Sequence, residues 1–435
     1  MSERQGLGRA AFGINLAGHL TAPQGLAVAA RNTAHVLSER GTPWVGIDVP
    51  PPAATGERVH ELTQSLWPAN ERAPQPVNLL HLNPPEVLEL LWAGPRWLDL
   101  DTRVTACVPF WEFPRLPGAW CDALACMDAV LAPSRFVQTA ISRELPGLPV
   151  FHFVQAVWLP TGVRADRARF GIPANACAFV TAFDTRSDLA RKNPLGALEA
   201  FRRAFADSGD DVRLVLRIQN ARGSAAEPGS AEAELRAAAA GDARVLLVDG
   251  PLTHADVLSL VASCDAYVSL HRAEGLGLGP LEAMALGRPA VATAWSGNLD
   301  YMSADDSLLV PAREVPVTGT SIRAYQQHRL GAGQTWGEPD LDVAARHLRA
   351  LAEDPSLRMQ LGARAAEAAL RQAEASRAGA ALERLRELSE RRGCGEPPAA
   401  ACVTARARVS RQRLARRTRR TIVNLLRAVG VGGRS

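Results

Sequence analysis

The sequence contains almost no lysine. Lys192 is the one lysine among 49 basic residues, and all the others are arginine. An ammonium is a compact point charge, whereas a guanidinium is a planar fork, so the two are not interchangeable. An isolated lysine in such a chain therefore directs attention to what its charge binds.

Two other absences narrow the class of protein. None of the seven cysteines forms a C-x-x-C pair, which argues against disulfides and structural zinc and predicts free, buried thiols in a reducing compartment. The chain has no apolar run of about 18 residues and no charged-then-apolar signal segment near its first residue. We therefore expect a cytoplasmic protein with no membrane span.

Acidic residues are absent after Glu396, where ten arginines follow. Without those ten, the formal net charge of +4 becomes −6, so a basic tail follows a mildly acidic body. Residues 403–430 place Leu414, Thr418, Ile422 and Leu425 or Leu426 at helical spacing. A basic amphipathic helix of this kind can lie on an anionic membrane surface, which would make the protein peripheral at the inner face of the membrane. A disordered tail, nucleic-acid contact and a helix docked on the acidic body are the alternatives, and we expect no nucleic-acid partner.

The length of 435 residues exceeds that of one typical domain. Predicted strands and helices alternate along the chain, which indicates doubly wound α/β architecture. We predict a first Rossmann-like domain over 1–165, a second over 166–392, and a linker with the basic tail over 393–435.

Residues 271–298 are the most informative stretch of the sequence. Glu274 and Glu282 stand eight positions apart, separated by a glycine-rich loop and the start of a short helix, and a buried strand follows. Glycines let a ligand approach the backbone, and a helix N-terminus offers free N–H groups and partial positive charge. The stretch therefore predicts a site for a diphosphate.

This stretch resembles the E-x7-E region of the retaining family-4 glycosyltransferases. The matching residues are Glu274, Gly275, Gly277, Leu278, Glu282, Ala283, Gly287, Pro289 and Val291. The resemblance implies the GT-B fold, in which two Rossmann-like domains face a cleft, and transfer of a sugar from a nucleotide-sugar donor to an acceptor hydroxyl with retention. It implies that Glu274 holds the donor sugar, that Glu282 holds the ribose, and that Leu276 lies in the donor loop with its neighbours.

Basic residues precede a predicted helix near the start of the second predicted domain. Lys192 matches the family's diphosphate-binding lysine, and Arg186 or Arg191 could be the accompanying arginine. A departing diphosphate gains negative charge, which such residues stabilise. We name Glu274, Lys192 and Arg186 as candidate catalytic residues and Arg191 as a donor-binding residue.

The first half offers weaker candidates. Gly25 lies in the first predicted strand-to-helix loop, which the resemblance places near the donor phosphates. The predicted strand over 78–83 ends in His81 and Asn83, and Trp111 and Glu112 lie at the carboxyl side of another predicted strand. Ligands of open α/β sheets bind outside the carboxyl ends of strands, so these four residues are candidates for the acceptor. Residues 336–340, W-G-E-P-D, are similar to an element of some bacterial relatives and are interpreted as structural.

No D-x-D motif lies in a glycine-rich loop at a strand end, and the resemblance implies no metal. We expect no cofactor, only a nucleotide-sugar donor and a sugar, lipid-linked or polysaccharide acceptor in surface polysaccharide or glycoconjugate synthesis. A non-catalytic nucleotide-sugar-binding protein with the same fold is the alternative.

Overall fold

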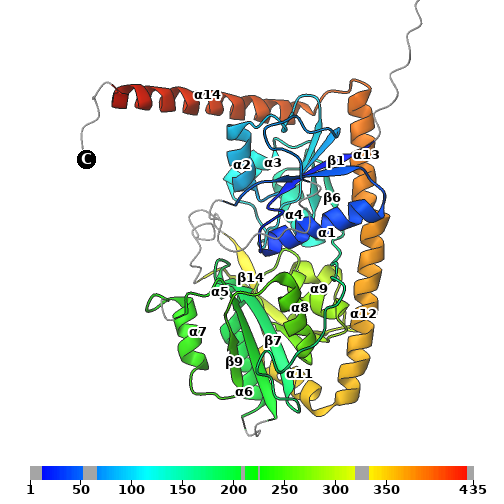
Figure 1. The fold of residues 1–435 in the computed structure, drawn as a ribbon, viewed down its shortest axis with the longest axis vertical. Helices are drawn as coiled ribbons and strands as arrows, with labels where there is room; N and C mark the ends of the chain where they lie inside the picture. The colour runs from blue at the N-terminus through cyan, green and yellow to red at the C-terminus, as the bar shows by residue number, and fades with distance from the viewer. Residues whose placement is uncertain (1–11, 52–65, 207–210, 224–225, 319–332, 429–435) are drawn as a thin grey trace, which may run out of the picture.

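The computed structural model describes residues 12–51, 66–206, 211–223, 226–318 and 333–428. It has two α/β domains, one above the other in Figure 1, and a long helix runs along both. Each domain is built on its own parallel sheet.

The first sheet has six parallel strands in the order β2-β1-β3-β4-β5-β6. Four of its strands are buried along their whole length, as expected for a parallel sheet covered on both faces. The strands are β1 (Ile14–Gly18), β2 (Trp44–Asp48), β3 (Val77–His81), β4 (Val104–Cys107), β5 (Ala129–Ala132) and β6 (Val150–His152). The helices between them are α1 (Gly25–Glu39), α2 (Pro84–Ala93), α3 (Gly118–Leu124) and α4 (Arg135–Glu144).

The second sheet repeats this architecture in the order β12-β11-β10-β7-β8-β9. Its strands are β7 (Cys177–Asp184), β8 (Val212–Gln219), β9 (Val245–Val248), β10 (Ala266–Ser269), β11 (Ala290–Thr293) and β12 (Leu308–Val310). The helical elements are α5 (Leu189–Lys192), α6 (Pro194–Ala204), α7 (Ala231–Ala239), α8 (His254–Ser263), α9 (Leu278–Ala285), the 3-10 helix η3 (Gly297–Asp300) and α11 (Leu341–Glu353). The prediction of two doubly wound α/β domains is confirmed.

Each sheet reverses its strand order next to its first strand. In the first sheet the reversal lies between β1 and β3, and in the second between β7 and β10. Ligands of open α/β sheets bind outside the carboxyl ends of the strands at such a switch point. The loops after β7 and β10 are therefore where the fold places a site.

An antiparallel hairpin joins β13 (Ala312–Pro316) to β14 (Thr335–Pro339). After it, α12 (Pro355–Ala378) runs along both domains, and α13 (Ala380–Gly393) lies on the first domain (Figure 1). Ala381, Leu382 and Leu385 of α13 are buried among strands of the first sheet. The chain thus returns from the second domain to complete the core of the first.

The last helix, α14 (Ala400–Ala428), docks on the first domain through its N-terminal part, beside α2. Cys402, Arg406 and Val409 are buried there. Its C-terminal part extends past α2, away from the body (Figure 1). The docked-helix alternative therefore holds for the N-terminal part of the tail, whereas the side chains of Ile422, Leu425 and Leu426 lie outside the described residues.

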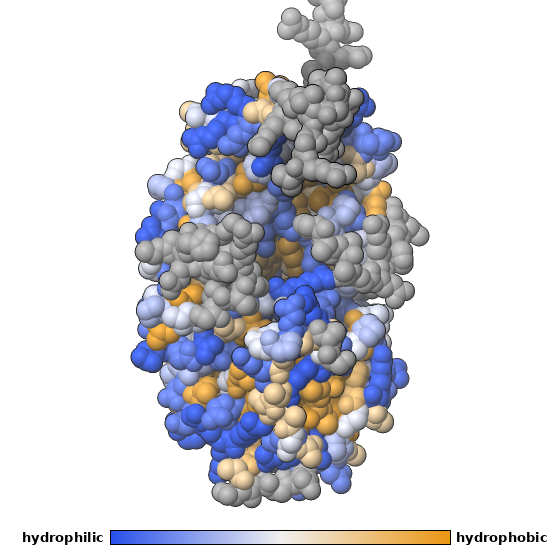
Figure 2. All heavy atoms as spheres, turned by 90° about the vertical axis from the view of Figure 1, so that its left-hand side faces the viewer, coloured by the Kyte–Doolittle hydropathy of each residue, from blue (hydrophilic) through white to orange (hydrophobic). Residues whose placement is uncertain are grey.

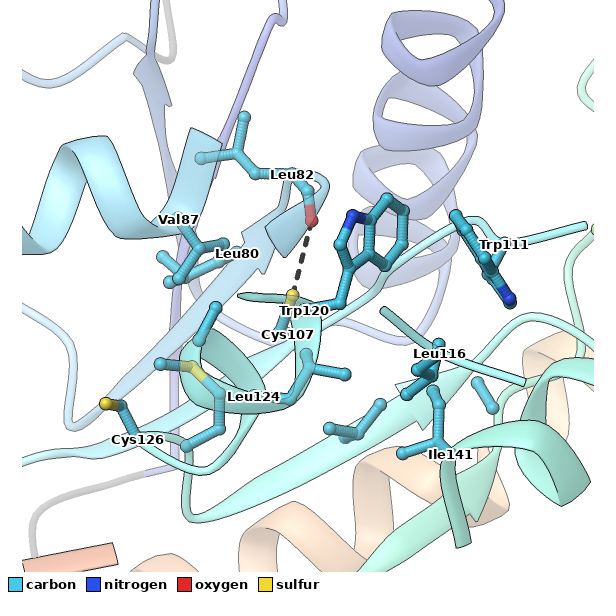
Figure 3. Packing of buried hydrophobic residues seen from close by; sticks show 14 of the residues in the cluster. Leu80, Leu82, Val87, Cys107, Trp111, Leu116, Trp120, Leu124, Cys126 and Ile141 are labelled. Carbon is cyan, nitrogen blue, oxygen red and sulfur yellow. Dashed lines mark hydrogen bonds between the residues drawn. The ribbon is translucent and has the colours of Figure 1, made fainter. Parts of the chain in front are cut away.

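Buried thiols contribute to the first domain's core. Figure 3 shows Cys107 and Cys126 among leucines, Trp111 and Trp120, and Cys107 Sγ donates a hydrogen bond to the Leu82 carbonyl at 3.2 Å. Burial raises the pKa of Cys126 to about 12, which keeps its thiol protonated. All seven cysteines are free; four are buried and Cys394 is exposed. Among the described helices, none is long and apolar enough to cross a membrane.

Candidate active site

Four charged residues meet between the two domains. Lys192 and Arg191 end α5, Glu274 follows β10, and Glu112 comes from the loop after β4 of the first domain. Lys192 Nζ donates to Glu274 Oε1, and Arg191 Nη1 lies 3.3 Å from Glu274 Oε2. Arg191 Nη2 also lies 3.6 Å from Glu112 Oε1. We call these four residues the charge cluster. The surface between the two domains is hollowed at mid-height (Figure 2).

The backbone around Asn193 explains how two adjacent basic residues reach this position. Asp188 caps the four-residue α5 by accepting from Arg191 N at 2.9 Å, and Asn193 then adopts a left-handed φ of 52°. Asparagine tolerates this conformation better than most residues. Its side chain caps α6 by accepting from Gly196 N at 3.1 Å and also donates to the Leu270 carbonyl at 2.8 Å. The turn therefore fixes Lys192 beside the end of β10.

The charge cluster determines the ionisation of Glu274. Burial would by itself raise the pKa of this carboxyl, since only 8% of Glu274 is exposed. The charges of Lys192 and Arg191 outweigh burial and lower its pKa to about 2. Glu274 is therefore a buried carboxylate at neutral pH, and it is paired with both cations.

The glycines between the two glutamates are required by packing. A Cβ on Gly275 would lie 2.9 Å from the Trp111 carbonyl oxygen, and one on Gly279 would lie 2.3 Å from the Tyr267 hydroxyl. Gly277 caps α9 with a φ of 87°, and its carbonyl accepts from the Tyr301 hydroxyl. Leu276 is buried, with 1% exposed, whereas Leu278 is half-buried. The loop is thus shaped by contacts on the protein side.

Glu282 lies in α9, one turn into the helix, and pairs with a histidine. His254 Nε2 lies 2.7 Å from Glu282 Oε1, and 8% of Glu282 is exposed. His254 is the first residue of α8, and Thr253 caps that helix. The sequence did not single out His254.

The first domain touches the glycine-rich loop between Glu274 and Glu282 directly. Ser134, the cap of α4, donates to the Gly275 carbonyl at 2.6 Å. Arg135 N donates to Asp300 Oδ2 at 2.8 Å. On the opposite side, Gln219 Nε2 donates to the Pro23 carbonyl at 2.6 Å, next to the loop that leads into α1. These bonds hold the two domains together around the charge cluster.

Three of the candidate acceptor residues serve the first domain's packing. His81 is fully buried, and its Nε2 lies 2.9 Å from Thr33 Oγ1. Burial lowers its pKa to about 3, so the ring is neutral. Trp111 is fully buried and donates to the Arg115 carbonyl at 2.9 Å, and Asn83 Oδ1 accepts from Phe110 N at 2.9 Å. His81 and Trp111 are directed into the fold, whereas Asn83 is half-buried.

Of the other candidate site residues, some belong to the charge cluster and others lie outside it. Glu112 and Arg191 belong to the charge cluster, whereas the Arg186 side chain is exposed and Arg186 N bonds Asp184 Oδ1 at 2.9 Å. Of the two candidate arginines, Arg191 is therefore the one beside Glu274. Gly25 begins α1, and a Cβ there would meet nothing within 4 Å.

Arg272 was missed by the sequence reasoning, although it stands two residues before Glu274. Its Nη1 donates to the Ala190 carbonyl at 2.7 Å, and its Nε and Nη2 donate to the two carboxylate oxygens of Glu338 at 2.5 and 2.9 Å. Glu338 lies in the W-G-E-P-D element, which forms β14. Within the described residues, no group of three or more His, Cys, Asp or Glu side chains is arranged to hold a metal ion.

The comparisons with known proteins agree with this geometry. Residues 186–325 match the family model described as Glycosyl transferases group 1. Solved structures with a similar fold include the sucrose-phosphate synthase of Thermosynechococcus elongatus, with 15% identity, a TM-score of 0.56, and coverage of 88% of this chain and 100% of that one. The fold is that of the GT-B glycosyltransferases.

A glycosyltransferase of Rickettsia africae shares the GT-B fold with 12% identity, a TM-score of 0.56, and coverage of 88% of this chain and 98% of that one. TarM of S. aureus matches with 13% identity and a TM-score of 0.48 over 72% of this chain, which spans 54% of the TarM chain. No curated protein sequence matches the chain. The matched region contains Lys192, Glu274 and Glu282, which are the residues on which the site rests.

Proposed function

We propose that the protein is a retaining family-4 glycosyltransferase that moves a hexosyl or related sugar from a nucleotide-sugar donor to an acceptor hydroxyl. The observation that carries the proposal is the charge cluster, in which Lys192 and Arg191 converge on Glu274 at the carboxyl ends of β7 and β10. The match of residues 186–325 to the glycosyltransferase model supports it.

The chemistry assigned to the cluster is electrostatic. Departure of the nucleoside diphosphate places negative charge on its phosphates, and fixed cations in a partly buried site stabilise that charge. Lys192, whose side chain is 24% exposed, is the cation that a ligand can reach, while Arg191 is buried behind it. Glu274 would bind the donor sugar and Glu282 the ribose.

The proposal is tested by separating nucleotide binding from turnover. Glu282→Ala should weaken binding of the nucleoside diphosphate, whereas Glu274→Ala should spare that binding and lower turnover of the full donor. Calorimetry with UDP, GDP and ADP, together with product formation from their sugar conjugates, gives both quantities. Equal loss of nucleotide affinity in both variants would overturn the assigned roles.

Retention is tested by the anomeric configuration of the product, read by NMR during the first turnover of donor. The alternative, a non-catalytic nucleotide-sugar-binding protein, requires binding with neither transfer nor donor hydrolysis. Lys192, Glu274 and Glu282 are all present, which favours the enzyme.

We propose further that no divalent metal is required, because Lys192, Arg191 and the N-terminus of α9 supply positive charge. Activity should then persist in excess EDTA. Loss of activity in EDTA with recovery on adding magnesium or manganese would overturn this part.

For the acceptor, we propose a lipid-linked or polysaccharide substrate that the tail helps to reach, with the protein cytoplasmic and peripheral at the membrane. Because α14 docks only through its N-terminal part, a chain ending at Arg416 keeps the docked contacts and loses most of the protruding segment. The full chain should sediment with anionic vesicles and not with neutral ones, and less so at high salt. Equal sedimentation of the full and shortened chains would remove the tail from this role.

A further inference from the structure

The hairpin of β13 and β14 lies between the two domains and contacts both. On the first-domain side, Trp336 is 2% exposed and packs with Phe113, with ring centroids 6.5 Å apart. Gln334 Nε2 donates to the Arg115 carbonyl at 2.8 Å, and Gln334 Oε1 accepts from Arg115 N at 3.3 Å. This end of the hairpin is therefore fixed to the first domain by apolar packing and by two hydrogen bonds.

On the second-domain side, the hairpin meets the segment that leads to Glu274. Gly337 N donates to the Arg272 carbonyl at 2.9 Å, and Glu338 accepts both bonds of the Arg272 fork. The Arg272 guanidinium carbon also lies 5.3 Å from the centre of the Trp336 ring. A bidentate pair stacked on an aromatic ring restricts the guanidinium in both position and plane.

The restricted guanidinium in turn holds the segment that carries the basic residues. Arg272 Nη1 donates to the Ala190 carbonyl at 2.7 Å, and Arg272 N donates to the Arg191 carbonyl at 2.7 Å. One residue therefore bonds two successive carbonyls just before Lys192 and stands two residues before Glu274. Arg272 is thus linked to Glu274 along the chain through Ala273, and to the segment that carries Arg191 and Lys192 by hydrogen bonds.

We propose that Arg272 and Glu338 are positioning residues that set the place of Lys192 and Arg191 relative to Glu274 and to the donor diphosphate. This inference rests on the proposed function, because it assigns a diphosphate to Lys192. Glu338 acts through Arg272 and through the backbone of α5, and neither residue is assigned a bond to substrate. Because the hairpin is attached to both domains, the geometry of the diphosphate site depends on how the hairpin is held between them.

The experiment compares binding of nucleoside diphosphates with binding of the matching nucleosides. UDP, GDP and ADP and their nucleosides are titrated calorimetrically into the wild type, Glu338→Gln, Arg272→Lys and Lys192→Ala. Glutamine keeps the size of Glu338 but removes its charge, and lysine keeps the charge of Arg272 but not the fork that bonds Glu338 and the Ala190 carbonyl together. Asp342→Asn is the matched control, because it removes a carboxylate that pairs with Arg203 on the surface, at 2.9 Å.

For the nucleoside diphosphate that the wild type binds most tightly, we expect the dissociation constant to rise about three- to tenfold in Glu338→Gln and in Arg272→Lys. The matching nucleoside should bind as it does to the wild type. The proposal assigns the ribose to Glu282, and Glu282 pairs with His254 rather than with Arg272 or Glu338. Asp342→Asn should match the wild type for both ligands. A merely structural loss would weaken both ligands together or only lower Tm.

The failures are distinguishable. If Lys192→Ala weakens the diphosphate but Glu338→Gln and Arg272→Lys leave it unchanged, the positioning role is wrong and the proposed function stands. If the wild type binds no nucleoside diphosphate, both are wrong. If Glu338→Gln fails to fold, as judged by circular dichroism, Arg272→Lys decides the outcome. The quantity compared is again the dissociation constant of the nucleoside diphosphate against that of the matching nucleoside.

Discussion

At the scale of single residues, Lys192 has the most specific role. Its ammonium is the partly exposed cation of the cluster, and its partner Glu274 is buried. Lys192→Ala should lower sugar transfer roughly ten- to a thousandfold, as expected for removal of one charge-stabilising group. Steady-state rates with the full donor provide the measurement.

Arg186→Ala is the control for this substitution. The Arg186 side chain is exposed and lies outside the charge cluster, so we expect a much smaller loss of transfer than in Lys192→Ala. An equal loss in both variants would return Arg186 to the catalytic role that its place in the sequence indicated.

Glu274 should make the stability of the protein depend on pH in a defined direction. Its pKa is lowered from 4.5 to about 2 in the folded protein by Lys192 and Arg191, against the effect of burial. The unfolded state therefore takes up a proton first as the pH falls, so the stabilisation by ionised Glu274 is complete above pH 4.5 and is lost towards pH 2.

The difference in unfolding free energy between wild type and Glu274→Gln should accordingly stay constant from about pH 7 to 5 and narrow below pH 4.5. Urea unfolding at several pH values measures this difference in free energy. Glu199→Gln, which changes an exposed glutamate, is the control for the effect of low pH on the protein as a whole. A difference that is independent of pH would show that Glu274 is not held as a carboxylate by its neighbours.

At the scale of elements, α14 shows how a basic segment can be part of the body. Arg406 Nη2 donates to Asp128 Oδ2 at 2.8 Å, and Arg406 Nε donates to the Cys126 carbonyl at 2.9 Å. Arg392 of α13 shares the same carboxylate through Asp128 Oδ1 at 2.6 Å. One buried aspartate thus joins the last two helices to the first domain.

Arg406→Ala should lower the free energy of unfolding by about 2 kcal/mol, because it removes charged hydrogen bonds at a site that is 9% exposed. Arg408→Ala is the control two residues away. Its pair with Asp122 leaves both side chains 59% exposed, so we expect a change below about 0.5 kcal/mol. Equal effects in denaturant titrations would mean that α14 is not docked through Arg406.

At the scale of the whole molecule, one of the contacts between the domains passes through Ser134. Its hydroxyl caps α4 and also donates to the Gly275 carbonyl across the interface. Ser230 caps α7 with the same distance of 3.3 Å to the third helical N–H and forms its cap within the second domain. The two serines therefore share the cap geometry, and they differ in burial and in the bond between the domains.

Ser230→Ala should cost about 1 kcal/mol of stability, the usual value of a cap. Ser134→Ala should cost about 1–3 kcal/mol more, because the buried Gly275 carbonyl loses its partner. Denaturant unfolding of both variants measures the difference. Equal costs would show that this bond contributes nothing to holding the domains together.

The sequence by itself determined the architecture and singled out Lys192, Glu274 and Glu282. Alternating strands and helices follow local hydrophobic periodicity, and the helix caps at Ser134 and Thr253 depend on neighbouring residues. The spacing between Glu274 and Glu282 and the isolation of Lys192 among arginines are likewise properties of the chain. These features could be predicted because they are encoded within short segments.

The tertiary structure alone decided which side chains meet. Arg191, not Arg186, faces Glu274 because the turn at Asn193 directs it there. His81 and Trp111 point into the core although His81 ends β3 and Trp111 follows β4. The bonds from Arg272 to Glu338 and from Ser134 to Gly275 join residues 66 and 141 positions apart. Such contacts depend on the packing of whole domains, and no local pattern in the sequence records the direction in which a side chain packs.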